Sequence, residues 1–298
     1  MPDETLVPPG ATVTEVNGLR ALRAGTDTGR VPLVLVHGGG ADHSGLSWYA
    51  AMGPLSRDRL VWAVDLPGFG GSIDVPPVGG PGQLARVVLN AMDAAGLPRA
   101  VVIGVSMGGD VSLNVALQAP SRVAGLVLVG PGGLIPVLRN ASTQRWAWRA
   151  ARLPDWLLVP MARVANRFAS RVLRTMVRDP AVLPVEVVRE FIAHSRHPRS
   201  GLAYGRYNQA TLGREGMLNN LTPRLGEVVA PTLFFHGAED RLVDPAGSVH
   251  AAAMMPHARA VIVPRCGHWA QLEAPERFLG EVQAFLGHLE EPPGRPGA

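Results

Sequence analysis

Short runs of apolar residues recur along the first part of the chain and again near its end. They are too short for buried helices and too uniformly apolar for half-exposed strands, and amphipathic segments separate them. This alternation predicts an α/β protein with a doubly wound, mostly parallel sheet that is covered by helices on both faces. The runs are residues 31–36, 60–64, 100–105, 126–129, 232–235 and 260–263.

The two ends of the chain follow other patterns. Residues 12–26 predict a β-hairpin, with Asn17 and Gly18 as its turn. Residues 271–289 have the spacing of a closing amphipathic helix, and the proline-rich residues 291–296 are expected to form a frayed tail.

Residues 134–225 differ from the rest of the chain in pattern and in charge. Helical periodicity covers residues 141–159, 162–177 and 185–194, and the segment has no strand-like run. It holds 15 arginines against 5 acidic residues, whereas the remainder has 13 arginines against 19. We therefore predict a helical cap at 134–225, inserted over the carboxyl edge of the sheet of a core formed by 1–133 and 226–298.

The arginine-rich faces of this cap allow two interpretations. They can be solvated surface, or they can attract an acidic partner or a membrane surface, because clustered positive charge has both uses. No motif indicates nucleic-acid binding, and the apolar runs fall short of the roughly 18 residues of a membrane span, so no stable membrane insertion is expected.

Composition adds few constraints. The 298 residues are 47% apolar and 17% charged, which is enough to bury a full core. The single cysteine, Cys266, rules out an internal disulfide framework and gives no metal-ligand cluster. The polar start is unlike a secretory signal, so a cytoplasmic protein is expected, while the oligomeric state stays open.

The most informative motif is a Gly-x-Ser-x-Gly sequence at residues 104–108. An apolar run ends in it, and helical spacing continues directly after it. A strand that turns this sharply into a helix lifts the side chain of its apex residue, Ser106, clear of the backbone. A flexible Gly/Ser loop is the alternative, and the strand–turn–helix context argues against it.

A serine hydroxyl needs a base within hydrogen-bond reach and a group that orients that base. His268 is the candidate base, because it stands in the loop that leaves the last apolar run. His37 and His236 also lie at strand ends, but each precedes a glycine and is expected to be a structural turn residue. For the other histidines a solvated position is expected; they are His43, His194, His197, His250, His257 and His288.

Asp240 is the candidate orienting acid. It lies just beyond the next-to-last strand, and the chain order Ser, Asp, His is the order expected for an elbow nucleophile in such a sheet. Glu239 and Asp244 are rivals, and an ordinary helix-capping or surface carboxylate is the structural alternative.

A glycine run directly after the strand at 31–36 can supply backbone donors for a developing oxyanion. In the sequence His37-Gly38-Gly39-Gly40 no side chain blocks the approach of a substrate to the N–H groups, and the Met107 N–H opens the helix after the elbow. A phosphate-binding loop is the alternative, but neither Gly-x-Gly-x-x-Gly nor a Gly-Lys-Ser/Thr sequence follows.

Together these patterns resemble the α/β-hydrolase superfamily over about residues 12–132 and 226–289. The resemblance rests on the glycine run, the Asp-Leu-Pro-Gly-Phe-Gly-Gly-Ser sequence at 65–72, the elbow, Gly237-x-x-Asp240 and Gly267-His268. It implies an eight-stranded, mostly parallel sheet with a helical lid. It also implies a triad of Ser106, Asp240 and His268, with the N–H groups of Gly39 and Met107 as the oxyanion hole.

Two patches resemble the carbon–carbon bond hydrolases that open meta-cleavage products of aromatic compounds. They are residues 37–40 and the sequence Cys-Gly-His-Trp-Ala-Gln at 266–271. Those enzymes usually carry Asn before the nucleophile, where this chain has Val105, and Pro-Gly-Ala after the glycine run, where it has Ala41-Asp42. Their cap arginine has no clear counterpart, although Arg189 lies near in the sequence.

The expected function is therefore a serine hydrolase that cleaves an ester or lactone through an acyl-enzyme, without cofactor or metal. An apolar Val105 suits such an uncharged small molecule better than a dienoate. Gly38, Val105 and Trp269 are expected to line the substrate site, with simple packing as the alternative for Trp269. Carbon–carbon bond hydrolysis is the second hypothesis, and a non-catalytic binding protein on the same fold is the third.

Overall fold

The computed structural model describes residues 5–290 except residue 167, so the expected tail at 291–296 lies outside the described residues. An eight-stranded sheet forms the centre, in the order β1-β2-β4-β3-β5-β6-β7-β8. β2 is antiparallel to both of its neighbours, and the pairs from β4 to β8 are parallel. The predicted eight-stranded, mostly parallel sheet is confirmed.

The strands are short and mostly apolar, as the sequence pattern indicates. Asn17 and Gly18 have φ angles of 50° and 74° and form the predicted turn between the first two strands. The strands are β1 (Thr12–Val16), β2 (Leu19–Ala24), β3 (Leu33–Val36), β4 (Val61–Val64), β5 (Ala100–Val105), β6 (Val123–Val129), β7 (Thr232–Gly237) and β8 (Ala258–Val263).

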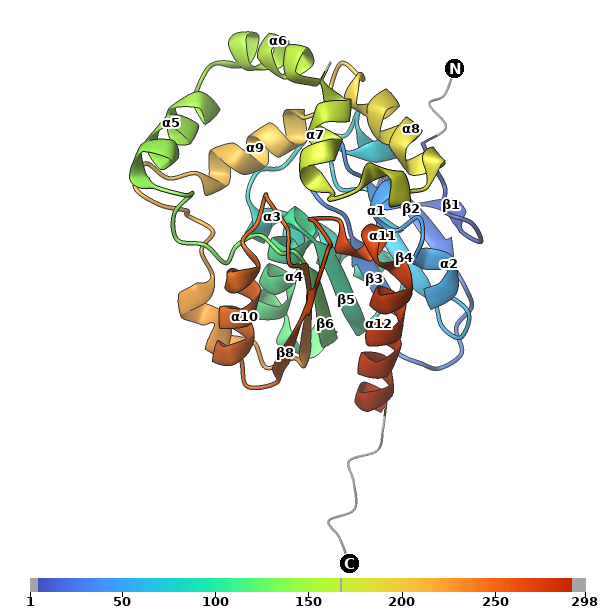
Figure 1. The fold of residues 1–298 in the computed structure, drawn as a ribbon. Coiled ribbons are helices and arrows are strands. Elements are labelled where there is room, and N and C mark those ends of the chain that lie inside the picture. The colour runs from blue at the N-terminus through green and yellow to red at the C-terminus, as the bar shows by residue number, and fades with distance from the viewer. Residues whose placement is uncertain (1–4, 167, 291–298) are drawn as a thin grey trace, which may run out of the picture.

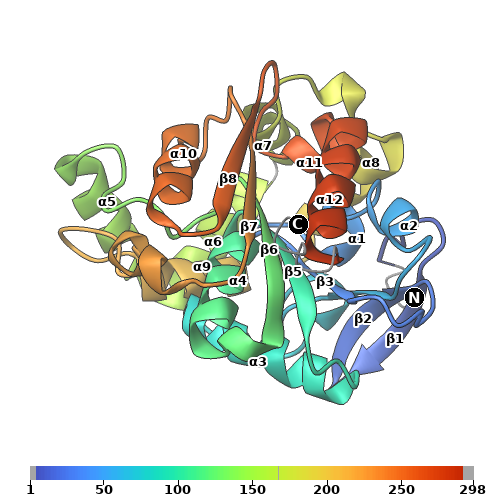
Figure 2. The same ribbon diagram turned by 90° about the horizontal axis from the view of Figure 1, so that it is seen from below.

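Helices cover both faces of the sheet and bury its side chains in two clusters. On β5, Val101, Ile103 and Val105 belong to one cluster and Val102 to the other, as the twofold alternation of a strand requires. α3, α4 and α10 lie on one face, and the short α1, α2 and α11 lie with α12 on the other (Figures 1 and 2). The core helices are α1 (Ser44–Ser47), α2 (Met52–Leu55), α3 (Pro81–Ala94), α4 (Met107–Gln118), α10 (Pro245–Met254), α11 (Ala270–Glu273) and α12 (Pro275–Glu290).

Between β6 and β7 the chain forms the helices above the sheet in Figure 1; we call residues 134–225 the cap. Its division from the core at these two residues stays a prediction. The described cap residues contain no strand, only an isolated bridge between Leu212 and Met217. The cap helices are α5 (Ala141–Ala151), α6 (Asp155–Asn166), α7 (Ala169–Met176), α8 (Val185–Ser195) and α9 (Leu202–Thr211).

The predicted cap helices at 141–159 and 162–177 were placed wrongly at their boundaries. The first break falls before Asp155, because Pro154 stands between α5 and α6, and α6 then continues through Pro160. α9 was not predicted, although it carries two tyrosines that face the core. The described residues also contain short 3₁₀ helices; they are η1 (Gly70–Ser72), η2 (Pro120–Arg122), η3 (Pro180–Val182) and η4 (Thr222–Glu227).

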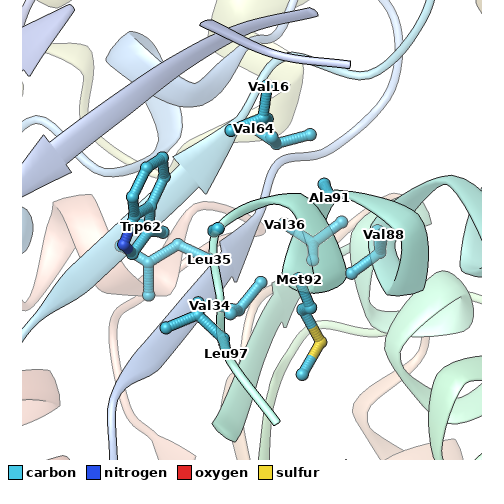
Figure 3. Close-up of a pocket in the computed structure, with 11 residues that line it drawn as sticks. Val16, Val34, Leu35, Val36, Trp62, Val64, Val88, Ala91, Met92 and Leu97 are labelled. Atoms are coloured by element: carbon cyan, nitrogen blue, oxygen red, sulfur yellow. The ribbon is translucent and has the colours of Figure 1, made fainter. Parts of the chain in front are cut away.

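Two further observations concern the length of the helices and the packing of the core. Within the described residues, no helix combines the length and the apolar character needed to cross a membrane. A cavity of about 20 Å³ lies between the sheet and α3 (Figure 3), and apolar side chains such as Val34, Val88 and Met92 line it. The surface of this cavity is apolar and its volume is close to that of a single water molecule, so the cavity is a packing gap in the core.

Candidate active site

The turn from β5 into α4 places Ser106 in a strained conformation. Its φ and ψ angles are 54° and −117°, and α4 begins at the next residue. The flanking glycines are required by close packing. A Cβ atom at Gly104 would lie 2.2 Å from the Gly108 carbonyl oxygen, and one at Gly108 would lie 2.2 Å from that of Val36. The structure therefore has the elbow geometry that the motif predicts.

His268 and Asp240 meet at the carboxyl edge of the sheet. The Nδ1 atom of His268 lies 2.6 Å from Oδ2 of Asp240, and both side chains are buried. Burial of Asp240 opposes its ionisation, but hydrogen bonds from His236 and His268 outweigh this and hold the pKa of Asp240 well below its usual range. The carboxylate thus accepts the Nδ1 proton of His268, which leaves Nε2 with a free lone pair.

His236 is a second partner of Asp240 and has a larger part in the site than its sequence context suggested. Its Nε2 atom lies 3.0 Å from the Asp240 carboxylate, and its Nδ1 atom lies 2.8 Å from the Ser248 hydroxyl. The backbone N–H groups of Leu242 and Val243 bind the other carboxylate oxygen. The spacing of four residues between His236 and Asp240 was the signal that could have indicated this contact.

The end of β6 and the segment after it lie beside both Ser106 and His268. The Ser106 N–H donates to the Val129 carbonyl oxygen at 2.9 Å, and the Gly132 N–H donates to that of Ser106 at 2.9 Å. Between them, a Cβ atom at Gly130 would lie 3.2 Å from Nδ1 of His268. The carboxyl ends of β5, β6 and β7 thus bring the elbow and the His–Asp pair to one place.

The glycine run after β3 lies beside the elbow. A Cβ atom at Gly38 would be 3.5 Å from the Cβ atom of Ser106. The Gly38 N–H donates to Oδ2 of Asp42 at 2.9 Å, so it is not offered to a substrate. His37 holds the run from below, with its ring nitrogens 2.7 Å from the Gly38 carbonyl oxygen and 3.0 Å from the Leu66 nitrogen.

Asp42 braces this loop, a role that sequence reasoning missed. Besides the Gly38 N–H, its carboxylate accepts hydrogen bonds from the His43 N–H at 2.8 Å and the Ser47 hydroxyl at 2.5 Å. Asp42, which stands where the sequence departs from the carbon–carbon bond hydrolases, is therefore a structural residue of this loop. The departure itself was visible in the sequence, but its partners were not.

Aromatic side chains from the cap cover the site. The ring of Tyr204 lies against Gly39, where a Cβ atom would be 2.3 Å from the ring. Trp269 is buried and packs edge-on against Phe191 of α8, with ring centroids 5.5 Å apart. Val105 is also fully buried. Trp269 thus takes part in packing between cap and core.

A buried carboxylate in the first turn of α4 links the elbow helix to the cap. Oδ2 of Asp110 accepts hydrogen bonds from the Tyr207 hydroxyl and the Asn219 amide, each at 2.6 Å, and Oδ1 accepts one from Asn114. Burial raises the pKa of Asp110 to about 6, although these donors favour the charged form. Sequence analysis did not single out Asp110, because one acidic residue in a first turn is ordinary.

Two histidines expected at the surface are buried, so that expectation was wrong. His43 caps the N-terminus of α1 beneath α8, with Nε2 3.1 Å from Oε1 of Glu190 and Nδ1 accepting from the Gly45 N–H at 3.2 Å. His194 packs against the His43 ring, and burial is the main reason that its pKa falls to about 4. Burial beneath α8 depends on the cap's position, which the local sequence does not encode.

His43, Glu190 and His194 are also the group that could hold a metal ion among the described residues, with ligand atoms within 4.8 Å of one another. Both ring nitrogens of His43 are already engaged in hydrogen bonds within the protein. The group therefore fits a hydrogen-bonded link between cap and core better than a metal centre.

Comparison with known proteins agrees with this geometry. Residues 31–275 match the family model described as alpha/beta hydrolase fold, so the chain belongs to that family. It is a hydrolase of this fold and hence an enzyme. This finding argues against the third hypothesis, a non-catalytic binding protein on the same fold.

Relatives and solved structures differ in their chemistry. The chain is 32% identical to a 2-hydroxy-6-oxononadienedioate/2-hydroxy-6-oxononatrienedioate hydrolase of Comamonas testosteroni, over 86% of this chain and 87% of the relative. It is similar to the 2-hydroxy-6-oxo-6-phenylhexa-2,4-dienoate hydrolase of Rhodococcus sp. strain RHA1, with a TM-score of 0.71 and 26% identity over 93% of this chain and 99% of the other. A bacterial membrane phospholipase A gives a TM-score of 0.75 and 25% identity, over 95% of this chain and 87% of the other.

Proposed function

We propose that the chain is a serine hydrolase that cleaves an uncharged carboxylic ester or lactone through an acyl-enzyme on Ser106. In this mechanism Nε2 of His268 takes the proton of the Ser106 hydroxyl as its oxygen attacks the carbonyl carbon, and gives that proton to the alkoxide that leaves when the ester C–O bond breaks. His268 then takes a proton from the water molecule that attacks the acyl-enzyme and returns it to Ser106 as the acid is released. Asp240 fixes the tautomer of His268 and stabilises the imidazolium. Its low pKa supports this role, because it keeps the carboxylate charged throughout the reaction.

Backbone N–H groups supply the oxyanion hole in this proposal. Met107 begins α4, so its N–H lies at the positive end of the helix dipole. Gly39 is the matching donor on the opposite loop, since the Gly38 N–H is held by Asp42. No step in this mechanism requires a metal or a cofactor, and a cytoplasmic location with a small-molecule substrate belongs to the same proposal.

The observation that carries the choice of substrate is the apolar surrounding of the nucleophile. Val105, next to Ser106, is fully buried and offers no hydrogen-bond donor side chain. Arg189 is exposed on α8. Among the cap arginines whose side chains the structure describes, none is buried, and the half-buried Arg206 binds Gln209. A substrate carboxylate would therefore enter without a visible charged partner, at a cost of several kcal/mol.

Carbon–carbon bond hydrolysis of a vinylogous diketone is the second candidate. The names of the two dienoate and dienedioate hydrolases favour it, and the same three residues would serve that reaction. The residues near the nucleophile support the ester proposal more strongly, because specificity depends on the pocket and sequence identity of about a third leaves the pocket free to differ.

A substrate panel tests the proposal. The purified enzyme is assayed with p-nitrophenyl esters of graded chain length, neutral lactones and a meta-cleavage dienoate, and is treated with a fluorophosphonate. We expect covalent labelling that the Ser106→Ala variant loses, and a higher kcat/KM for at least one ester or lactone than for the dienoate. Labelling combined with preferred turnover of the dienoate would select the second candidate, and absence of labelling would reject both.

A further inference from the structure

The outer helices of the cap expose an unusual number of large apolar side chains. Trp146 and Trp156 are 70% and 72% exposed, more than the other large apolar residues that the structure describes. Elsewhere such residues are scattered singly, as is normal for a protein surface. We define the outer cap face by six exposed side chains within one continuous segment: Trp146, Trp156, Met161, Val164, Phe168 and Val172.

Their spacing puts two pairs of these side chains on the faces of two successive helices. Trp156 and Val164 are eight residues apart on α6, and Phe168 and Val172 are four residues apart at the N-terminal end of α7. Figure 1 shows α5 and α6 at the outer rim of the molecule, farthest from the sheet. These apolar side chains on α6 and at the start of α7 are thus left uncovered by the described part of the chain.

Positive charge surrounds the outer cap face. Residues 139–178 contain nine arginines and one acidic residue, Asp155. Three of these arginines lie over aromatic rings that are three or four residues earlier in the sequence. The guanidinium carbon of Arg149 is 5.8 Å from the ring centroid of Trp146, that of Arg152 is 4.7 Å from Trp148, and that of Arg171 is 5.2 Å from Phe168.

We propose that the outer cap face docks the protein peripherally on an anionic phospholipid bilayer. Tryptophan and aliphatic side chains enter the headgroup region of a bilayer, while arginine binds lipid phosphates at the same depth. A nucleic acid would satisfy the arginines but leave the six apolar side chains in water. A second copy of the chain would bring two like-charged faces together, each with a net charge of +8 over residues 139–178.

The outer cap face is separate from the candidate active site. A cavity of about 260 Å³, lined by residues such as Ala147, Leu158 and Leu202, lies between α5 and α6 on one side and α9 on the other. The inner helix α9 carries Tyr204, whose ring contacts Gly39. Docking therefore uses side chains that take no part in the site, and it goes beyond the proposed ester hydrolysis without depending on it.

Flotation of the full chain with vesicles tests the proposal. Vesicles of phosphatidylcholine alone are compared with vesicles that contain phosphatidylglycerol, at about 0.1 M and about 0.5 M NaCl. We expect roughly tenfold or stronger binding to the anionic vesicles, and a loss of most of that binding at high salt. Quenching of tryptophan fluorescence by brominated lipid is expected only with the anionic vesicles.

Matched variants test whether vesicle binding depends on the outer cap face or on exposed residues in general. Val164→Ser and Val13→Ser change equally exposed valines, at 55% and 56%, and only the first is expected to weaken binding. The triple variant Arg149→Gln/Arg152→Gln/Arg171→Gln is expected to reduce binding about tenfold or more. Its control changes three exposed core arginines to glutamine and is expected to bind as the parent does; they are Arg23, Arg57 and Arg99.

Several outcomes would overturn the proposal. Equal binding to neutral and anionic vesicles would remove the role of charge, and equal losses in the cap and control variants would remove the role of this face. A lipid-free dimer that Trp156→Ser dissociates would assign the face to a second copy. Tighter binding to duplex DNA than to vesicles would assign it to nucleic acid. Ser106→Ala is expected to bind vesicles normally, so failure of the proposed catalysis stays distinguishable.

Discussion

The core and the outer cap treat polar and apolar groups in opposite ways. In the core, buried carboxylates lie at the carboxyl edge of the sheet, and each accepts several hydrogen bonds; Asp42, Asp110 and Asp240 are examples. In the outer cap, Trp146 and Trp156 stand largely in water. This difference fits the two proposed roles. The core would hold the catalytic groups in fixed positions, and the outer cap face would bind a membrane surface.

The inner cap helices connect these two regions. The Met176 carbonyl oxygen at the end of α7 accepts the His268 N–H at 2.7 Å, and Glu190 of α8 bonds to His43. On α9, Tyr207 bonds to Asp110 and Tyr204 covers Gly39. This difference between the core and the outer cap predicts three kinds of effect. Substitutions of the core residues at the candidate site should abolish activity, substitutions at the contacts between cap and core should weaken it, and substitutions in the pocket should change the substrate preference.

The largest effect is expected for the nucleophile. Ser106→Ala should lower kcat by about 10⁴-fold or more while the protein stays folded, because in the proposed mechanism its hydroxyl forms the acyl-enzyme. Steady-state assays on the best ester, with circular dichroism as the folding check, measure this. The control Ser112→Ala, in the same helix, should stay within about threefold of the parent. Retention of more than about a tenth of the activity by Ser106→Ala would place the catalytic centre elsewhere.

The next effect concerns the orienting acid. Asp240→Asn should lower kcat by about 10²- to 10⁴-fold, since an amide can offer His268 a donor in place of an acceptor and so favour the wrong tautomer. Glu239 is exposed and pairs with Arg178, and Asp244 caps α10, so Glu239→Gln and Asp244→Asn should have small effects. Steady-state kcat of the three variants decides the assignment. An inactive Glu239→Gln enzyme with an active Asp240→Asn enzyme would refute it.

Ser106, Asp240 and His268 could be picked out from the sequence because local rules place them. The elbow and the His–Asp pair lie directly after strands, so an apolar run and its flanking glycines fix their positions. The roles of Asp42 and Asp110 were not accessible in the same way. The cap partners of Asp110 come from a distant part of the chain, since Tyr207 and Asn219 are 97 and 109 residues away from it. The partners of Asp42 are close in the sequence, but no motif indicates how the loop folds to bring them onto its carboxylate. The predicted helix boundaries in the cap were wrong because its prolines allow the same amphipathic pattern to be divided in several ways.

Asp110 gives a pH-dependent test of the contact between elbow and cap. Its folded-state pKa of about 6 exceeds the ordinary value of 3.8, so the native state binds more protons between these values. Its contribution to the free energy of unfolding is therefore full below about pH 4 and is lost as the pH rises through 6, by at most about 3 kcal/mol. Asp110→Asn should remove this part of the pH dependence.

Urea unfolding at several pH values between 4 and 8 measures the difference between variant and parent. Asp74→Asn, at an exposed position, is the control for the removal of one carboxylate from the surface. If Asp110→Asn and the parent lose stability in parallel over this range, the buried carboxylate is not the group that titrates.

A smaller effect is expected where Tyr204 covers the glycine run. Gly39→Ala would place its Cβ atom 2.3 Å from the Tyr204 ring, so the loop or α9 must move. We expect kcat/KM to fall about 10²-fold, the usual result of misplacing a catalytic group by about 1 Å. Adding Tyr204→Ala should restore about tenfold, and Gly226→Ala, whose Cβ atom would meet nothing within 4 Å, should be neutral. A double variant no better than Gly39→Ala would mean that the methyl group blocks substrate directly.

The smallest effect separates the two candidate reactions. A dienoate carries a carboxylate that must leave water on entering the pocket, and Val105 offers it no donor. Neutral esters and lactones carry no such charge. We therefore expect kcat/KM for a short neutral ester to exceed that for a dienoate by about tenfold or more, which corresponds to about 1.4 kcal/mol of transition-state binding.

Two substitutions at Val105 test the reason for this preference. Val105→Asn supplies a donor beside Ser106 and should narrow the ratio, whereas Val105→Ala removes bulk without supplying a donor and should leave the ratio within about threefold of the parent. Equal changes in both variants would mean that pocket volume, rather than charge, sets the preference. A dienoate that the parent enzyme turns over faster than every ester would show that the pocket already pairs the carboxylate. Carbon–carbon bond hydrolysis would then be the proposed reaction. A cap residue that covers the site, rather than Val105, would then determine which substrate the enzyme accepts.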